Sequence, residues 1–271
     1  MKIAITSDLH FGLTSPGDIA DMLGRMQETE APDTLIVAGD LGEPFRNFVG
    51  CLDILVGSGI PQIGVVAGNH DVWRSAKISS AELFEERMPA ACREHGIAWL
   101  EDDSLILTDG TAVCGSMAWY DYSDLAEPHR SWAQKKKGRY VKDAVYIDWS
   151  WTDEEVAARC RNKLLKRLQA CQDNPEVKRI VLATHIPIFA EQLVRHPGDD
   201  PTSSAYFKNL VTGDAILNAE ISKLRYVASG HTHREVKWRP LVREVNEILV
   251  ATLASDYYSP QWTMIETSPV Q

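Results

Sequence analysis

The sequence predicts an α/β fold with a mostly parallel β-sheet, and three observations support this prediction. Short apolar runs rich in β-branched residues alternate with amphipathic segments of helical period along the first third of the chain. Such runs are typical of strands that are buried on both faces of a parallel sheet. A content of 44% hydrophobic residues in 271 residues is enough for a sizeable core.

The first predicted elements alternate between strand and helix. Strands are expected at residues 2–8, 34–40 and 62–68, with helices at residues 18–29 and 45–59. Ser79 and Ser80 are typical residues for the start of the next helix, and Gly96 for its end. Short strands with turn signals follow at residues 98–110 and 111–120. This order indicates βαβ units.

The second half begins with a mixed segment, residues 121–150, which we interpret as an insert or lid. A helix is predicted next, because Thr152 can cap it and Glu155 can reach back to the cap. Further strands are expected at residues 178–185 and 225–233, and a β-hairpin at residues 246–268. Since no repeat or low-complexity linker interrupts the chain, we expect a single domain over residues 1–271.

The composition limits the possible classes of function. The formal net charge is -10, and an acidic surface repels nucleic-acid backbones, so nucleic-acid binding is not expected. The five cysteines are odd in number and contain no C-x-x-C pair, which indicates reduced, buried thiols. No signal peptide and no membrane-spanning run are found, and we therefore expect a cytoplasmic protein that is not bound to a membrane.

Polar side chains that can bind metals follow the ends of the predicted strands. In an open α/β sheet the carboxyl ends of the strands form the site, so residues far apart in the sequence can converge there. Glycines precede several of them and permit close backbone approach. Five of the eight histidines lie in these segments, which chance explains poorly. The candidate ligands are Asp8, His10, Asp40, Asn69, His185, His231 and His233.

The spacing and the chemistry of these residues favour a dinuclear site. Asp8 and His10 are two residues apart, as are His231 and His233, and in extended backbone such residues point the same way. Carboxylate, amide and imidazole ligands without thiolate suit Mn, Fe, Zn or Co. Seven ligands are too many for one catalytic ion that keeps an open position, but they suit two ions that share a carboxylate.

Together these motifs resemble the calcineurin-like metallophosphoesterase superfamily. The ordered set is D-x-H at residues 8–10, GD at 39–40, GNHD at 68–71, a lone histidine at 185 and GHTH at 230–233. The resemblance implies a four-layer α/β/β/α sandwich of two mixed β-sheets flanked by helices. It also implies a dinuclear metal site at the carboxyl ends of the strands and metal-dependent hydrolysis of phosphoric esters.

The family pattern assigns a role to each matching residue. Asp40 would bridge the two ions, and a bridging hydroxide would attack phosphorus in line. His70 would stay off the metals and give a proton to the leaving oxygen as general acid. The first ion would take Asp8, His10, Asp40 and His233, and the second Asp40, Asn69, His185 and His231.

The sequence departs from the pattern of the related Ser/Thr protein phosphatases after Asp40. Pro44 stands where those enzymes have a phosphate-binding arginine, and nearby Arg46 is a substitute only if it is not a surface residue. Glu43 takes the place of a second aspartate and could orient His70. Asp71 could instead hold the imidazole ring, or could cap the turn by binding backbone amides, which we favour.

Substrate contacts are less well defined by the sequence. Trp119, Tyr120 and Tyr122 follow a predicted strand and are either core aromatics or a wall beside the substrate. His196 is a further candidate because it is close to His185 in the sequence. We expect hydrolysis of a phosphodiester, with a small diester or nucleotide-like molecule as substrate. The alternatives are a phosphomonoesterase or protein phosphatase, a DNA- or RNA-processing nuclease, and a scaffold without activity.

Overall fold

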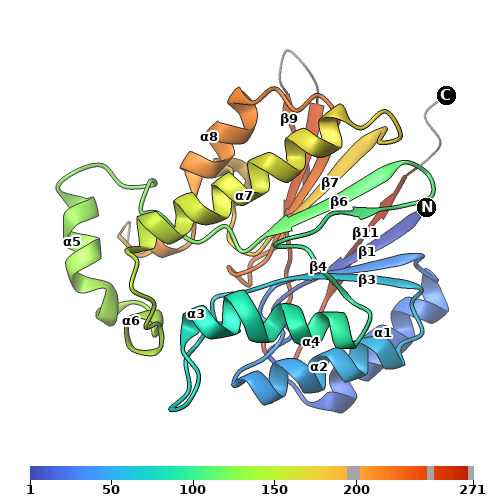
Figure 1. Ribbon diagram of the computed structural model, residues 1–271, viewed down its shortest axis with the longest axis horizontal. Coiled ribbons are helices and arrows are strands. Elements are labelled where there is room, and N and C mark those ends of the chain that lie inside the picture. Colours follow the sequence, from blue (N-terminus) through green and yellow to red (C-terminus); the bar gives the residue numbers. More distant parts are fainter. Residues whose placement is uncertain (194–201, 243–246, 268–271) are drawn as a thin grey trace.

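Two β-sheets stacked face to face form the centre of the molecule (Figure 1). The computed structural model describes residues 1–193, 202–242 and 247–267. The first sheet contains parallel strands and one antiparallel edge strand, β11, which pairs with β1. Its order is β11 (Trp262–Glu266), β1 (Lys2–Thr6), β2 (Thr34–Ala38), β3 (Gln62–Val66) and β4 (Ala98–Trp99).

The second sheet is also mixed. Four parallel strands form its middle, and an antiparallel strand closes each edge. Its order is β5 (Leu105–Ile106), β6 (Thr111–Ser116), β7 (Arg179–Thr184), β8 (Leu224–Ser229), β10 (Glu247–Thr252) and β9 (Val236–Val242).

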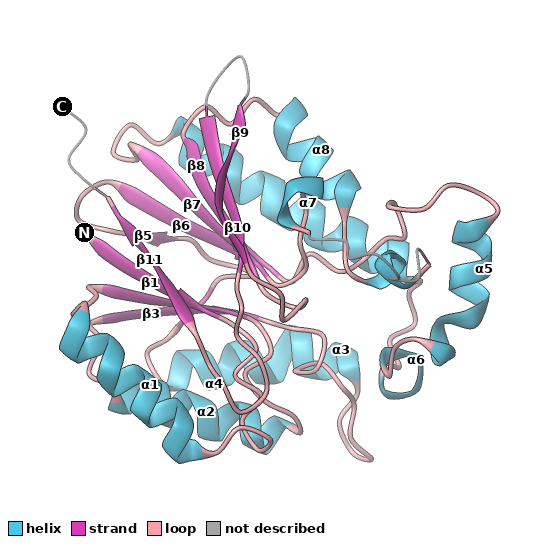
Figure 2. Cartoon of the chain, turned by 180° about the vertical axis from the view of Figure 1, so that it is seen from behind, coloured by secondary structure: helices cyan, strands magenta, loops and turns pink. Residues whose placement is uncertain are grey.

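Helices cover the outer face of each sheet, as the view from behind also shows (Figure 2). α1 (Pro16–Thr29), α2 (Phe45–Gly57) and α4 (Met88–Glu94) lie against the first sheet. α7 (Asp153–Asp173) and α8 (Leu210–Asn218) lie against the second. The predicted α/β/β/α sandwich of two mixed sheets is therefore confirmed. The short elements are α3 (Ser80–Glu82), η1 (Leu83–Arg87), α5 (His129–Lys136), η2 (Lys137–Arg139), α6 (Asp143–Tyr146), η3 (Ala190–Gln192) and η4 (Ser203–Tyr206).

The apolar core is divided into three layers, because each sheet buries both faces. Between the sheets, β-branched side chains such as Ile5, Ile36 and Val181 are fully buried. The other two layers lie between a sheet and its helices, with Phe48 in one and Leu164 in the other. Strands buried on both faces explain why the apolar runs of the sequence are continuous rather than alternating.

Local sequence sets the helix ends. The Thr152 hydroxyl accepts a hydrogen bond from the Glu155 amide, and the Glu155 carboxylate accepts one from the Thr152 amide, so the predicted capping box is confirmed. Ser15 caps α1 through the Asp18 amide. Among the helices in the described part of the chain, none combines the length and the apolar character needed to cross a bilayer.

The prediction of a C-terminal hairpin is wrong. β10 lies inside the second sheet between β8 and β9, whereas β11 completes the edge of the first sheet beside β1. The hairpin partner of β10 is β9, a strand that the sequence analysis did not predict, and α8 was missed as well. The residue pattern of β10 is the same whichever sheet the strand joins. Its pairing partner is decided by contacts between residues far apart in the sequence, which the periodicity of one strand does not encode.

Residues 121–150 fold into α5, η2 and α6, beside the N-terminal end of α7 (Figure 1). Hydrogen bonds tie this segment to the chain that follows β3. The Arg74 amide donates to the Tyr146 carbonyl at 2.8 Å, and the Ser80 amide donates to the Asp148 carboxylate at 2.8 Å. The segment is therefore anchored beside the loop that carries Asn69 and His70.

Candidate dinuclear metal centre

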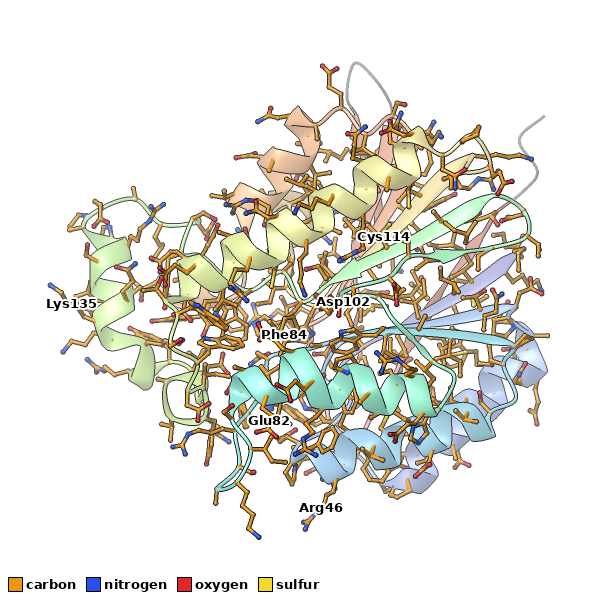
Figure 3. All side chains as sticks on the ribbon, in the orientation of Figure 1. Arg46, Glu82, Phe84, Asp102, Cys114 and Lys135 are labelled. Atoms are coloured by element: carbon orange, nitrogen blue, oxygen red, sulfur yellow. The ribbon has the colours of Figure 1, made fainter. Side chains whose placement is uncertain are left out.

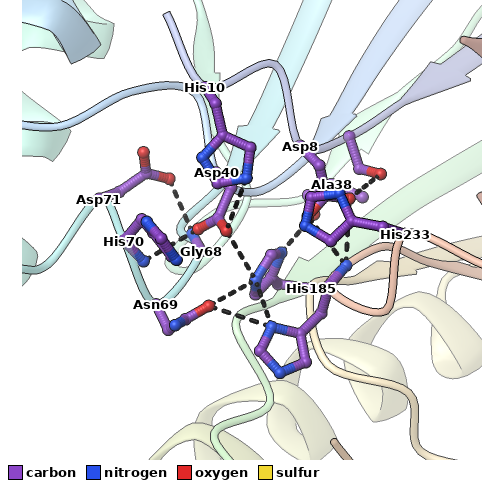
Figure 4. A network of polar contacts seen from close by, with 12 residues as sticks. Asp8, His10, Ala38, Asp40, Gly68, Asn69, His70, Asp71, His185 and His233 are labelled. Atoms are coloured by element: carbon purple, nitrogen blue, oxygen red, sulfur yellow. Dashed lines mark hydrogen bonds and ion pairs between the residues drawn. The ribbon is translucent and has the colours of Figure 1, made fainter. Parts of the chain in front are cut away.

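The seven predicted ligands converge at the carboxyl ends of five strands (Figure 4). The loops after β1, β2 and β3 supply Asp8, His10, Asp40 and Asn69 from the first sheet. The loops after β7 and β8 supply His185, His231 and His233 from the second. The site thus lies where the ends of the two stacked sheets meet, which is why residues at opposite ends of the chain come together.

The ligands do not lie in extended backbone, which corrects one step of the sequence argument. β1 ends at Thr6 and β8 ends at Ser229, before the first ligand in each case. Five ligands have left-handed backbone, at a free-energy cost of roughly 1–3 kcal/mol each. Their φ angles are 51° at Asp8, 42° at His10, 54° at Asp40, 69° at His231 and 52° at His233. Half of the ten non-glycine residues with positive φ in the described chain are therefore predicted ligands, and backbone strain of this kind is typical of functional sites.

Gly68 is needed because two strand-end loops touch at this position. A Cβ atom on Gly68 would lie 2.0 Å from Asp40 Oδ1 and 2.2 Å from the Asp40 amide nitrogen. The neighbour is backbone as well as side chain, so it cannot rotate away. The predicted close approach of backbone at this glycine is confirmed.

Substitution of Gly68 by alanine is expected to push Asp40 out of place. We expect a loss of roughly 1–3 kcal/mol in the free energy of unfolding and a lower affinity for metal ions. Urea denaturation and metal analysis of the purified variant measure the two effects. Gly24→Ala is the matched control, since a Cβ on Gly24 in α1 meets nothing within 4 Å. If Gly68→Ala binds metal and unfolds like the control, the close approach has no role.

Asn69, His185 and His231, the predicted ligands of the second ion, form the second half of the site. Three of their atoms that bear lone pairs converge there. Asn69 Oδ1 lies 3.0 Å from His185 Nε2 and 3.1 Å from His231 Nδ1, and the two ring nitrogens are 3.2 Å apart. The other nitrogen of each ring contacts a backbone carbonyl: His185 Nδ1 contacts Ala38 O at 2.9 Å, and His231 Nε2 contacts Tyr206 O at 3.0 Å. These carbonyls assign the ring protons to the outer nitrogens and leave the inner lone pairs free.

This arrangement fits a metal ion. Ligand atoms about 2.1 Å from one ion lie about 3.0–3.4 Å apart, which matches the three separations. Without a cation, two imidazole lone pairs and an amide oxygen would repel one another at this distance. Asp40 Oδ2 lies 3.5 Å from His185 Nε2, so a carboxylate oxygen faces the same position.

The other half of the site holds Asp8, His10 and His233 around the same Asp40. Asp40 Oδ2 lies 3.5 Å from His10 Nε2, and Asp8 Oδ1 lies 3.7 Å from His233 Nε2. His10 is completely buried, and neither of its ring nitrogens has a hydrogen-bond partner within the described residues. A buried polar group without a partner is costly, and a metal ion would satisfy it. Asp40 Oδ2 faces both halves, as a bridging ligand would.

Glu43, and not Asp71, contacts the imidazole of His70. Glu43 Oε1 lies 3.3 Å from His70 Nδ1, and Glu43 Oε2 lies 3.8 Å from His10 Nδ1. Burial would raise the pKa of Glu43, but the contacts with His10 and His70 outweigh it and lower the pKa to about 2. The carboxylate is therefore ionised, and it contacts the His70 ring while it lies within ion-pair distance of His10.

Asp71 braces the turn, as the favoured interpretation expected. Its two carboxylate oxygens accept hydrogen bonds from the Gly42 amide at 2.9 Å and from the Gly68 amide at 2.8 Å. It thereby ties the loop after β2 to the loop after β3. Burial raises the pKa of Asp71 to about 7, although these backbone donors lower it in part.

A family model for calcineurin-like phosphoesterases matches residues 1–235. The chain belongs to this family. Members of this family are metallophosphoesterases, hydrolases of phosphoric esters that depend on a dinuclear metal centre, and the described residues contain groups that could hold metal ions. No curated protein matches the chain in a sequence comparison.

Solved structures share the fold of this phosphoesterase at low sequence identity. A phosphopantetheinyl hydrolase from Mycobacterium tuberculosis has a TM-score of 0.71 at 18% identity, over 97% of this chain and 95% of its own. A dimetal phosphatase from Danio rerio has a TM-score of 0.56 at 10% identity, over 93% and 86% of the chains. The protein TT1561 of Thermus thermophilus has a TM-score of 0.52 at 12% identity, over 93% and 88%.

The two buried histidines of the second half are neutral in this phosphoesterase. Burial lowers the pKa of His185 to about 4, and it lowers the pKa of His231 well below its usual value. Neutral imidazoles are the form that binds metals. Burial, together with the nearby Asp71 and Asp8 carboxylates, raises the pKa of Asp40 well above its usual range, and bound cations would reverse that shift.

The metal-free protein is expected to lose stability in acid through His185. The unfolded chain takes up a proton on this imidazole near pH 6.5, but the folded chain does so only near pH 4. The unfolded state therefore binds more protons between these values, and the free energy of unfolding falls by up to roughly 3 kcal/mol as the pH drops through this window. Urea denaturation of metal-free wild type and His185→Gln at several pH values checks this. Equal pH slopes for the two proteins would contradict it.

The aromatic residues predicted as a substrate wall are buried instead. Trp119 and Tyr120 are completely buried and Tyr122 nearly so, because the segment after β6 packs under α7 and η4. Their polar atoms are used internally: Trp119 and Tyr122 donate to Asp153, and Tyr120 donates to Asp143. The core interpretation of the sequence is the correct one.

The remaining two predicted contacts are not part of the site as described. Arg46 is exposed and projects outward from the start of α2 (Figure 3), so it is a surface residue and does not replace the missing arginine. His196 lies outside the described residues. The sequence analysis missed Tyr257, whose ring lies 4.4 Å from the His10 ring and 4.9 Å from the His233 ring. It also missed Trp73, which stacks on His70 at 3.8 Å.

Proposed function

We propose that this phosphoesterase hydrolyses a phosphodiester, with a small diester or a nucleotide-like molecule as substrate. The contact of Glu43 Oε1 with His70 Nδ1 at 3.3 Å carries the proposal. His70 Nε2 has no hydrogen-bond partner within the described residues, and the His70 amide donates to Asp40 Oδ1 at 2.9 Å, which keeps this residue next to a metal ligand. A donor in this place can protonate a poor alkoxide leaving group, which alkyl diesters and alkyl monoesters share.

The charges near Asp40 favour a diester over a monoester. A monoester carries two negative charges at neutral pH and a diester carries one. Pro44 is uncharged and Arg46 faces solvent, so neither of these two positions supplies the arginine grip of the protein phosphatases. The site therefore suits the less charged substrate, and the net charge of -10 argues against a nucleic-acid polymer.

We assign the ligands by halves around Asp40. Asp8, His10 and His233 would hold the first ion with Asp40, and Asn69, His185 and His231 the second. When bound, two ions supply an activated water and neutralise charge on the phosphoryl oxygens. The chain's own residues orient the site: Glu43 holds His70, Asp71 holds the two loops together, and the carbonyls of Ala38 and Tyr206 hold the ring protons of His185 and His231. Mn, Fe, Zn and Co suit this ligand set.

A substrate panel tests the proposal. Aryl and alkyl monoesters, linear diesters, and 2′,3′- and 3′,5′-cyclic nucleotides are each assayed with Mn, Fe, Zn, Co and Mg. We expect the highest kcat/KM with a diester and a transition ion. A clear preference for monoesters would replace the proposed phosphodiesterase activity with a phosphatase activity.

We also propose that residues 1–271 act as one cytoplasmic domain in which residues 121–150 are an insert.

A further inference from the structure

Asn69 presents its oxygen to the second half of the metal site, and this orientation needs a cause. An asparagine amide can turn by 180° about its terminal torsion, which would replace the oxygen by an NH2 group that cannot bind a cation. Asn69 Nδ2 donates a hydrogen bond to Asp143 Oδ1 at 2.9 Å. A carboxylate only accepts, so this contact is possible in one orientation of the amide and not in the other.

Asp143 lies in α6, within the insert and outside every motif of the metal site. Its side chain is almost completely buried, at 1% exposure, and three neutral donors surround it. In addition to Asn69, the Trp73 indole donates to Oδ1 at 2.7 Å and the Tyr120 hydroxyl donates to Oδ2 at 3.1 Å. Three donors to one buried carboxylate fix its position.

The Asp143 carboxylate also holds a residue that stacks on the His70 ring. Trp73 donates to Asp143 and also stacks on the His70 ring at 3.8 Å. Asn69, which precedes His70, and Trp73, three residues after it, are therefore held by a single oxygen, Asp143 Oδ1. A contact outside the metal ligands can thus set the geometry of a ligand and of the proton donor together.

We propose that Asp143 is a positioning residue of the metal centre, through which the insert holds the Asn69 oxygen toward the second ion and the His70 ring against Trp73. This inference rests on the proposed ligand assignment and not on the proposed substrate. The insert is then part of the working site rather than only a cover.

Metal titration of Asp143 variants tests the proposal. Asp143→Leu keeps the branched shape of the side chain, with two methyl groups in place of the two oxygens, but removes both acceptors, so the Asn69 amide loses its fixed orientation. We expect the affinity for one of the two Mn or Zn ions to fall roughly 10- to 100-fold, measured by competition with a chelating dye. Asp143→Asn should restore most of it, because its oxygen can face Asn69 and Trp73 while its NH2 donates to Tyr120.

Asp148→Ala is the matched control from the same segment. The Asp148 carboxylate anchors the insert to the Ser80 amide at 2.8 Å, but no contact with Asn69 is found for it in the described structure. We expect this variant to bind both ions like wild type. Equal metal affinity in Asp143→Leu and wild type would overturn the proposal, as would an equal loss in Asp148→Ala.

Folding and function are separated by further readouts. Should Asp143→Leu fail to fold, Asp143→Ser, which leaves room for a water, is titrated in the same way and decides the question. Wild type that binds no pair of ions would refute the metal centre itself. Wild type that binds two ions but hydrolyses only monoesters would refute the proposed substrate and leave the role of Asp143 intact.

Discussion

Asp40→Ala is expected to abolish the binding of the metal pair and almost all activity. Asp40 Oδ2 lies 3.5 Å from both His10 Nε2 and His185 Nε2, so this oxygen faces both halves of the site. Two bound ions contribute several kcal/mol to transition-state stabilisation, and kcat/KM should fall by roughly 10³-fold or more. Metal analysis of the dialysed variant and steady-state kinetics measure the two effects.

The stability of the metal-free Asp40→Ala protein should not fall in parallel. Burial and the Asp71 and Asp8 carboxylates oppose the charge of Asp40, so its removal relieves repulsion in the empty site while it loses the bond from the His70 amide. We expect a melting temperature near that of metal-free wild type. An unfolded variant would mean that Asp40 is a structural residue, and two tightly bound ions in a folded variant would refute its bridging role.

His70→Ala is expected to slow hydrolysis while both metals remain bound. His70 is not among the seven ligands, and its Nδ1 contacts Glu43. Loss of a general acid lowers kcat by about 10²- to 10⁴-fold for a substrate with a poor leaving group. With a very good leaving group the effect should be small, because the departing oxygen then needs no proton. The kcat values for a series of leaving groups, with the metal content of each sample, measure this.

A second histidine variant, made away from the metal site, is measured in the same way. His95→Ala is the control, since His95 contacts Asp53 near the end of α4 and none of the metal ligands. If His70→Ala loses both ions, the assignment of His70 as general acid is wrong.

The metal site was the most predictable part of the structure. Its ligands are recognisable by residue type, and each follows a buried strand whose carboxyl end must lie at the edge of a sheet. The backbone conformation was not predictable from the same argument. His10 and His231 reach the site through left-handed backbone, at 42° and 69°, and only contacts with other loops over-determine such strained angles.

Errors arose where one pattern fits two long-range arrangements. The apolar run of β10 and the run of β11 can pair with each other or enter different sheets, and strand periodicity is the same in both cases. A tyrosine that follows a strand, as Tyr120 does, can belong either to the core or to the rim of a site. Packing of α7 and η4 over Tyr120 places it in the core. Residue type does not report what packs above a side chain.

The sequence by itself determined which groups can bind the metals, their order along the chain and the family to which the chain belongs, because these depend on residue type and on the ends of local strands. Only the tertiary structure decided that Glu43 contacts His70, that Asp71 joins two loops and that Asp143 holds Asn69. In each case, several carboxylates of equal chemistry could make the same contact. The distances between the groups decide which one does, and these distances are set only when the two sheets are stacked.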